Sequence, residues 1–540
     1  MSAKSQNFLR GAFNLSIATA AVKIIGALYK IPILRLLGEE GSSLYYVAYN
    51  IYTILFVIAT AGLPVAISKM VSESHTAGRK DAEQIFSVAF KLFLVIGTIG
   101  ALFILFFADW IAAMMNAEEA VWAIRAIAPS VFLIVFICPY RGYYQGQGNM
   151  TPTAVSQVLE ALGKLIFGVG LTVLVMYVII PAETVGDEII NQTPRNTYGS
   201  AAAILGVSIG ILFSAAYLIL SGRSIGLGKA RKIERRRKSI LKEMVSLAIP
   251  ITIGSVILNL TNLIDAGLTR GLLVSGANFT EEVRDLYHGA YVWAATLYTL
   301  PTAFVLTIAV SLLPAIAAFR VRKDRDGVIR TARSAVRVTA LIGMPAGIAF
   351  IALPQPLLGL LYGSGSAGVE IAAPLLRVLG IAVIFVCIVT VTNSILQSLG
   401  LVFIPVLTMS LGAAVKIIFT YVLVGNPDIH INGAPVGTVA CFGLIAVLNI
   451  IIVMKATGAG LAMLSELGKP FLAAAGMGTI ALGCYYFFAY FLGAKIGVLL
   501  AMGAGGLSYV LLLIVIKGIP KRDIELLPGG KKLARILQIH

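Results

Sequence analysis

Long, uninterrupted runs of apolar residues recur along the whole chain, and they constrain its fold more than any other feature. About 20 residues of apolar helix cross the hydrocarbon core of a membrane. The runs are too long and too uniformly apolar for barrel strands, which alternate over about ten residues. Helices are expected instead, because a helix satisfies its own backbone hydrogen bonds in lipid. The sequence therefore predicts an all-α integral membrane protein.

About fourteen of these runs are long enough to span a bilayer. They lie at roughly 12–34, 43–68, 85–107, 121–143, 153–179, 199–220, 244–269, 287–318, 331–353, 371–398, 403–424, 435–454, 470–492 and 496–516. The composition agrees, since 58% of the residues are hydrophobic and only 12% are charged, where a soluble domain has about 25% charged residues. A soluble enzyme, a disordered chain and a nucleic-acid-binding module are excluded.

The net charge of +17 is explained by where the basic residues lie. With the N-terminus inside and each span switching sides, the inner segments hold most of them, including the cluster at 235–238. The outer segments hold only Arg35, Arg195, Arg270, Arg284 and Lys495. Basic loops stay on the cytoplasmic side, so both termini are predicted to lie in the cytoplasm, with the protein in the cytoplasmic membrane. No nucleic-acid partner is expected.

The chain also contains a repeat. QGQG at 145–148 and GKLIF at 163–167 match QSLG at 397–400 and VKIIF at 415–419 at one constant offset. Spans one to six thus match spans seven to twelve, which predicts two pseudo-symmetric six-helix lobes plus two C-terminal helices. Two such lobes can rock about a central cleft. The predicted domains are a first lobe (1–220), a basic cytoplasmic linker (221–243), a second lobe (244–455), and a tail (456–540) with two helices and a basic cytoplasmic C-terminus.

Two lysines in the first span are candidate substrate-binding residues. Lys23 and Lys30 are two helical turns apart, so their ammonium groups lie on one stripe, roughly 10 Å from each other. A charge inside a membrane normally faces a cavity or a partner. Because no acidic residue lies nearby in the span, this stripe favours an anionic headgroup.

Three further in-span charges form an ion-coupling or ion-pairing set. Asp265, at the outer end of span seven, is interpreted either as a partner of a lysine in substrate binding or as the site of a coupling cation or proton. Glu160 and Lys164 have the i,i+4 spacing of a helical ion pair, and local neutralisation is their simplest role.

Enzyme signatures are scarce. The sequence has no HExxH metal motif and no Walker-type phosphate loop, so no metal, nucleotide or other cofactor is expected. The membrane potential, an ion gradient or consumption of the product outside would have to drive transport. The DxD at 324–326 is the motif of a membrane glycosyltransferase, but it lies in a short basic inner loop, where such spacing arises readily by chance.

Three segments resemble a known superfamily. GALYKIPILRLLG at 26–38, GLPVAISKMVSE at 62–73 and YYQGQGNMTPTAVSQVLEALGKL at 143–165 are similar to the multidrug/oligosaccharidyl-lipid/polysaccharide exporter superfamily. Within it, the likeness is to the stage V sporulation protein B group and the lipid II flippases. The resemblance implies a V-shaped pair of lobes around a cationic cavity, with a groove for a polyprenyl tail at the last two spans. It also implies that Lys23 binds a diphosphate-sugar headgroup. Lys30 falls where some relatives have an acidic residue, and the second and eighth spans lack the basic residues of Gram-negative members.

The sequence thus predicts a transporter, not an enzyme. Its expected substrate is a polyprenyl-diphosphate-linked saccharide, lipid II in the first place, moved from the inner to the outer leaflet by alternating access. The other expected partners are membrane lipids and cell-wall synthesis enzymes. The alternatives are a cation-coupled multidrug exporter and a flippase for another cell-wall, capsule or spore polysaccharide intermediate. A scaffold without transport is a further reading, against which the in-span charges count.

Overall fold

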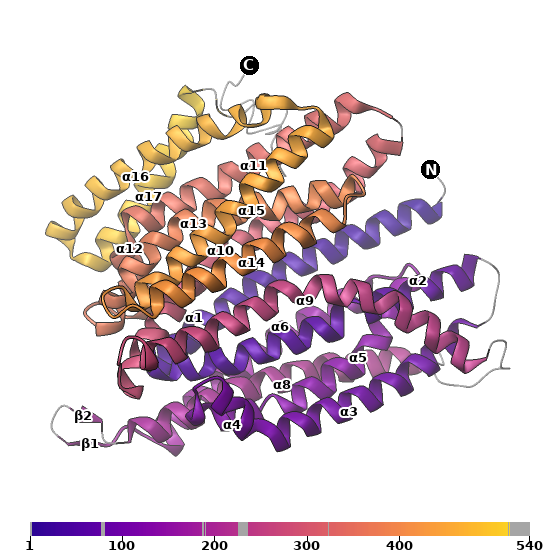
Figure 1. The fold of residues 1–540 in the computed structure, drawn as a ribbon, viewed down its shortest axis with the longest axis horizontal. Helices are drawn as coiled ribbons and strands as arrows, with labels where there is room; N and C mark the ends of the chain where they lie inside the picture. The colour runs from indigo at the N-terminus through magenta and orange to yellow at the C-terminus, as the bar shows by residue number, and fades with distance from the viewer. Residues whose placement is uncertain are drawn as a thin grey trace. The chain divides into compact units, whose positions relative to one another are not determined.

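The chain divides into two compact units, residues 1–289 and 290–540. The computed structural model describes residues 3–76, 81–185, 188–189, 191–224, 236–321, 323–516 and 518, and at some helical positions, Lys23 among them, it describes the backbone alone. Nearly all of the described residues are helical (Figure 1).

The elements follow one another in the order of the predicted spans. The first unit contains α1 (Ala3–Ala61), α2 (Leu63–Thr76), α3 (Ala82–Met114), η1 (Glu118–Ala120), α4 (Val121–Arg125), α5 (Ala128–Gly146), α6 (Thr151–Gly163), η2 (Lys164–Gly168), α7 (Val169–Leu174), η3 (Val175–Ile179), β1 (Thr184–Val185), β2 (Glu188–Ile189), α8 (Gln192–Ser224), α9 (Arg237–Ser275) and the start of α10 (Glu281–Val321). The rest of α10 and the following elements form the second unit: α11 (Arg325–Ala352), α12 (Pro354–Tyr362), α13 (Ala367–Ser398), α14 (Phe403–Val424), η4 (His430–Asn432), α15 (Gly433–Thr457), η5 (Gly460–Met463), α16 (Ser465–Leu492) and α17 (Ala494–Val515).

Every predicted apolar run falls on helices, apart from short breaks. Among the described residues, twelve helical segments are long and apolar enough to cross a membrane. The two predicted runs 12–34 and 43–68 contribute one of them, Leu28–Ser74, and α9, whose middle is not fully described, is not among the twelve. The all-α membrane fold is therefore confirmed.

A glycine replaces the loop expected between the first two spans. α1 runs through this region as 59 residues, with non-helical backbone only at Gly38 (φ 67°, ψ −167°), a conformation that is essentially restricted to glycine. The arms on either side touch, since Tyr45 lies with its hydroxyl 3.4 Å from that of Tyr29. Ser42 donates to the carbonyl of Leu34 at 3.1 Å, across the break.

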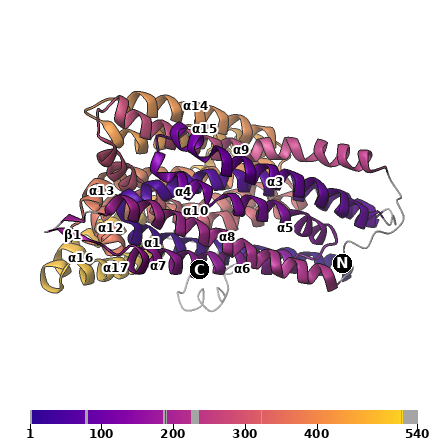
Figure 2. The same ribbon diagram turned by 90° about the horizontal axis from the view of Figure 1, so that it is seen from below.

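The packing within each unit follows the predicted repeat. In the first unit α3 packs on α5, and α8 packs on both α5 and α6. In the second unit α11 packs on α13, and α15 packs on both α13 and α14; Figure 2 shows α14 beside α15. Each helix thus has the neighbour that its counterpart has, as a duplicated bundle requires. The domain boundaries at 220 and 455 stay predictions.

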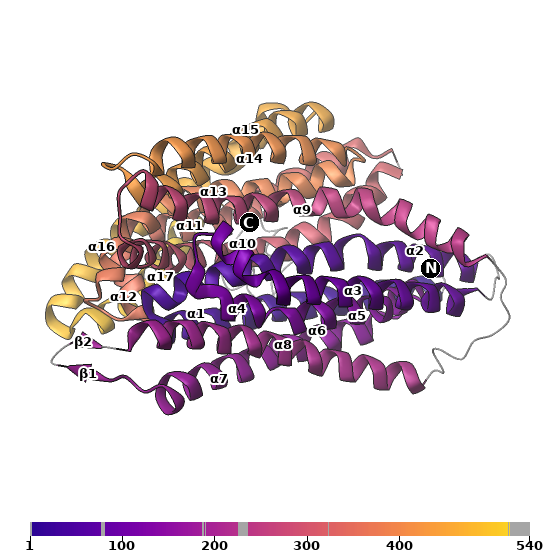
Figure 3. The same ribbon diagram turned by 60° about the horizontal axis from the view of Figure 1, so that its bottom comes forward.

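Two hairpins lie outside this pattern. In the second unit α16 and α17 pack on each other, and α16 also packs on α11. Glu466 anchors α16 there, since its carboxylate accepts from Arg333 at 2.5 Å and lies 3.4 Å from Arg337. In the first unit, the antiparallel pair β1–β2 projects beyond the ends of α7 and α8 (Figure 3).

Candidate functional site

Lys30 faces an aromatic ring instead of an acid. It lies on the first arm of α1, half-buried, with its Nζ 4.6 Å from the ring centroid of Tyr49 on the second arm. An ammonium group over a ring is stabilised by the negative face of the π-system. Among the residues that the structure describes, no carboxylate lies within ion-pair distance of Lys30, so its positive charge is not neutralised.

Tyr49 belongs to a row of aromatic rings along the second arm of α1. Tyr45, Tyr49, Tyr52 and Phe56 follow one another with centroids 5.4, 5.7 and 5.7 Å apart. Their spacing of three or four residues places them on one face of the helix. Tyr45 and Tyr52 are buried, whereas Tyr49 and Phe56 are partly exposed. The row therefore presents two partly open ring surfaces.

A charged network meets the same row from α5, α6 and η2. Lys164 donates to Tyr52 Oη at 3.1 Å and to Glu160 Oε1 at 2.7 Å. Glu160, which is 5% exposed, also accepts from Arg141 at 2.9 Å, and Arg141 donates to Ser156 at 3.1 Å. One acid thus lies between two bases, and the buried network carries a net positive charge.

The predicted ion-pairing residues therefore lie in two places. Glu160 and Lys164 form the i,i+4 pair, and Lys164 and Lys30 reach the same aromatic row. Asp265 lies on α9 and is 3% exposed. Lys23 lies on the first arm of α1, but its side chain is outside the described part of the structure.

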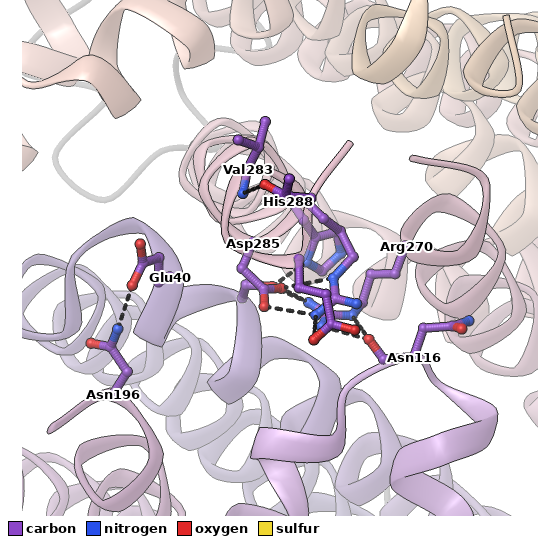
Figure 4. Close-up of polar contacts among 11 residues, drawn as sticks. Glu40, Asn116, Asn196, Arg270, Val283, Asp285 and His288 are labelled. Carbon is purple, nitrogen blue, oxygen red and sulfur yellow. Dashed lines mark hydrogen bonds and ion pairs between the residues drawn. The ribbon is translucent and has the colours of Figure 1, made fainter. Parts of the chain in front are cut away.

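A second polar cluster lies at the predicted outer end of the first unit. Arg270 on α9 is fully buried, pairs with Asp285 and donates to Ser43. It also donates to the carbonyl of Asn116 at 2.7 Å (Figure 4). Ser43 lies 2.8 Å from Nδ1 of His288. The cluster thus joins α1, the turn after α3, α9 and α10.

The sequence did not single out Arg141 or this second cluster. The charge distribution places Arg270 and Arg284 in outer segments between spans, whereas the structure buries both inside helices α9 and α10. The partners of Arg270 lie on other helices, so no local spacing could identify its contacts, whereas Arg284 pairs with its neighbour Asp285 on α10 itself. One feature of the sequence could have drawn attention to Arg270 and Arg284. Both are basic residues on the predicted outer side, where basic residues are rare because they concentrate in cytoplasmic loops.

The DxD motif has a structural role in this fold. Asp324 precedes α11, and its Oδ1 accepts from the backbone N–H of Gly327 at 2.8 Å. This is the N-cap interaction that satisfies a free donor in the first helical turn. The cap accounts for Asp324 without a bound metal.

Comparison with known proteins places this arrangement in a family. The model of the polysaccharide biosynthesis protein family matches residues 8–320. Stage V sporulation protein B of Bacillus subtilis (strain 168) is 27% identical over 534 residues, covering 97% of this chain and 98% of that protein. The lipid II flippase MurJ of the same organism is 24% identical over 440 residues, covering 78% of each chain.

Solved structures show the same fold. A lipid II flippase MurJ in an inward closed conformation superposes with a TM-score of 0.68 at 15% identity, covering 93% of this chain and 98% of that one. An inward-facing transporter of the multidrug resistance MATE family, in the MOP superfamily, gives a TM-score of 0.64 at 15% identity, covering 83% and 99%. The chain belongs to the polysaccharide biosynthesis protein family, and it is a multi-pass membrane protein with the fold of these transporters.

Proposed function

We propose that the protein is a flippase for a polyprenyl-diphosphate-linked saccharide, lipid II first, which it moves from the inner to the outer leaflet by alternating access. Two named relatives support this proposal. One is the lipid II flippase MurJ, and the other is a sporulation protein whose length this chain matches almost completely. The headgroup would cross between the lobes while the lipid tail stays in the membrane.

The observation that carries the proposal is the environment of Lys30. Its ammonium group is half-buried, lies over Tyr49 and has no acidic partner in the described part of the chain. A diphosphate supplies the missing negative charge, and charge-assisted hydrogen bonds of this kind are the strong ones. Lys23 is two helical turns before Lys30 in the sequence and is proposed as the second cation for the diphosphate.

The neighbouring rings suit the saccharide. Tyr49 and Phe56 are partly exposed, and aromatic side chains beside a few placed polar groups are typical of the lining of small-molecule sites. An organic cation, the typical cargo of a multidrug exporter, would be repelled by Lys30. The cation-coupled exporter is therefore the weaker alternative.

Asp265 is proposed either to pair with a lysine in substrate binding or to bind a coupling cation or proton, because it is a buried acid on α9 and an ionisable residue inside a membrane is a candidate functional residue. Glu160 is neutralised by Arg141 and Lys164, which supports a local ion-pairing role for Glu160 and Lys164. The proposed setting is the cytoplasmic membrane, with both termini inside and cell-wall synthesis enzymes as partners.

The test measures which leaflet holds lipid II in cells depleted of this protein and of any redundant flippase. A lipid II-cleaving enzyme added outside reports what has crossed. Re-expression of the native chain should restore cleavage, whereas Lys30→Gln and Lys23→Ala should reduce it about tenfold or more, because each loses a charge-assisted contact. Lys242→Gln, at an exposed position on α9, is the matched control and should transport normally.

The possible outcomes distinguish an error in the proposed cargo from an error in the proposed lysine site. If depletion leaves cleavage unchanged, lipid II is not the principal cargo. The test then moves to other polyprenyl-linked intermediates, with a spore-wall precursor first because of the sporulation relative. If the native chain restores cleavage and both lysine variants do so equally well, the transport assignment stands and the lysine site is wrong.

A further inference from the structure

The second polar cluster links the two halves of the sequence repeat. Ser43 and Asn116 belong to the first predicted lobe, whereas Arg270, Asp285 and His288 belong to the second. All five lie within one compact unit of the structure. We infer that this cluster, here called the outer latch, holds the outer ends of α1, α9 and α10 together and must separate once in each transport cycle. This inference rests on the alternating access proposed above.

The latch is centred on a buried ion pair with several further contacts. Arg270 pairs with Asp285, and its Nε and Nη2 both donate to the carbonyl of Asn116, at 3.0 and 2.7 Å. Arg284 donates to the second carboxylate oxygen of Asp285 at 3.0 Å. Ser43 donates to Asp285 at 2.9 Å. One carboxylate thus accepts from three donors on three helices.

Such a cluster is stable only while it stays together. Separating α1 and the turn after α3 from α9 and α10 would leave Asp285 without Ser43 and Arg270 without the carbonyl of Asn116. A buried charge that loses its partners is costly unless water reaches it. The latch would therefore have two favourable states, one dry and closed and one open and hydrated, as a gate requires.

Close backbone packing surrounds the charges and makes the closed state specific. A Cβ at Gly289 would collide with the carbonyl oxygen of Glu39, which directly follows the break in α1. On α9, Gly267 and Gly271 have the GxxxG spacing of close helix contacts, and a Cβ on them would approach Met115 and Asn116 to 3.2 and 3.0 Å. Any side chain at position 289 would therefore hold α10 away from α1.

A thiol reporter can measure the opening without any cargo. Thr269, next to Arg270 on α9, is 1% exposed, so Thr269→Cys should react slowly with a membrane-impermeant maleimide added outside. The parent for this test carries Cys484→Ala, because Cys484 is the partly exposed one of the four cysteines. Adding Arg270→Ala should raise the labelling rate about tenfold. The substitution removes contacts that exist only in the closed state, so the fraction of molecules in the open state increases.

Arg195→Ala is the matched control. Arg195 is also a buried arginine at the predicted outer end, and it donates to the carbonyls of Met176 and Ile180 at 3.2 Å each. In the described part of the chain, both of these contacts lie within the first half of the repeat. This variant should leave labelling of Thr269→Cys unchanged.

Two further variants test the latch even if Arg270→Ala does not fold. Gly289→Ala should raise labelling by holding α10 away from α1 while all charges remain. Conversely, oxidising a Ser43→Cys/His288→Cys pair to a disulfide should stop transport, and a reductant should restore it. Oxidation of Ser130→Cys/Ser208→Cys, whose native hydroxyls lie 2.6 Å apart within the first half, should leave transport intact.

The labelling and transport measurements test the latch and the cargo independently. Unchanged labelling in Arg270→Ala and Gly289→Ala, with folded protein in the membrane, overturns the latch whatever the cargo is. Increased labelling in a protein that does not expose lipid II keeps the latch and overturns the cargo proposal. Transport that continues through the 43–288 disulfide also overturns the latch.

Discussion

Glu160 lies in the interior of the first unit, between two cations. Its carboxylate oxygens are 2.9 Å from Arg141 and 2.7 Å from Lys164, and all three side chains are largely buried. Removing one member of such a group leaves the others as uncompensated buried charges. In the second repeat the positions of Arg141 and Ser156 hold Asn393 and Thr408.

These second-half residues form a network without charges. The amide of Asn449 donates to Asn393 at 2.7 Å and accepts from Thr408 at 2.9 Å. The positions of Arg141 and Ser156 thus belong to an ion-pair network in one half and to a network of amides and a hydroxyl in the other. Sequence spacing could predict the Glu160–Lys164 pair, because both residues are on one helical face. Arg141 could not be assigned to it, because that contact depends on how two helices pack.

We predict that Glu160→Gln destabilises the protein by about 3–5 kcal/mol, because Arg141 and Lys164 both lose their counter-charge in a buried site. Thermal unfolding in detergent measures the loss. Glu73→Gln is the control, since its ion pair with Lys69 is about half exposed and contributes at most about 1 kcal/mol. Equal, small losses in both variants would mean that the buried network is not a stabilising one.

At the scale of elements, hydropathy could predict nearly every helix. The backbone N–H and C=O groups of each apolar run must form hydrogen bonds within the run itself, because lipid offers none, and a helix does this. It could not predict how consecutive spans are joined. The outer loop expected before residue 43 is reduced to a break at Gly38, and the run at 153–179 contains the two π-helical segments η2 and η3. Both features depend on local backbone geometry and on the packing of neighbours, which apolar periodicity does not record.

Gly38→Ala should cost about 1–3 kcal/mol, because alanine cannot adopt its backbone conformation without strain. Gly26→Ala on the same helix is the control. No heavy atom lies within 4 Å of the position of its Cβ, and alanine is the better helix former by about 0.5–1 kcal/mol. Unfolding curves of the two variants should therefore shift in opposite directions. A shift of the same size and sign would show that the break tolerates a side chain.

At the scale of the whole molecule, the distribution of charge makes a prediction that the fold alone does not test. Alkaline phosphatase fused after Asn278, between α9 and α10, should be active, because the enzyme folds only outside the cytoplasm. Fused after Lys323, between α10 and α11, it should be inactive. The opposite pattern would invert the predicted topology, and the outer latch would then lie at the inner surface.

The break at Gly38 also has a consequence for biogenesis. The arms of α1 touch through Tyr29 and Tyr45, and through Lys30 and Tyr49, and only a short stretch of chain joins them. With such a short connection, one arm cannot lie across the bilayer while the other arm is still outside the membrane. The first two spans must therefore leave the translocon together as a preformed helical hairpin. The aromatic row and the Lys30 contact would then be assembled before the ribosome has completed the next span.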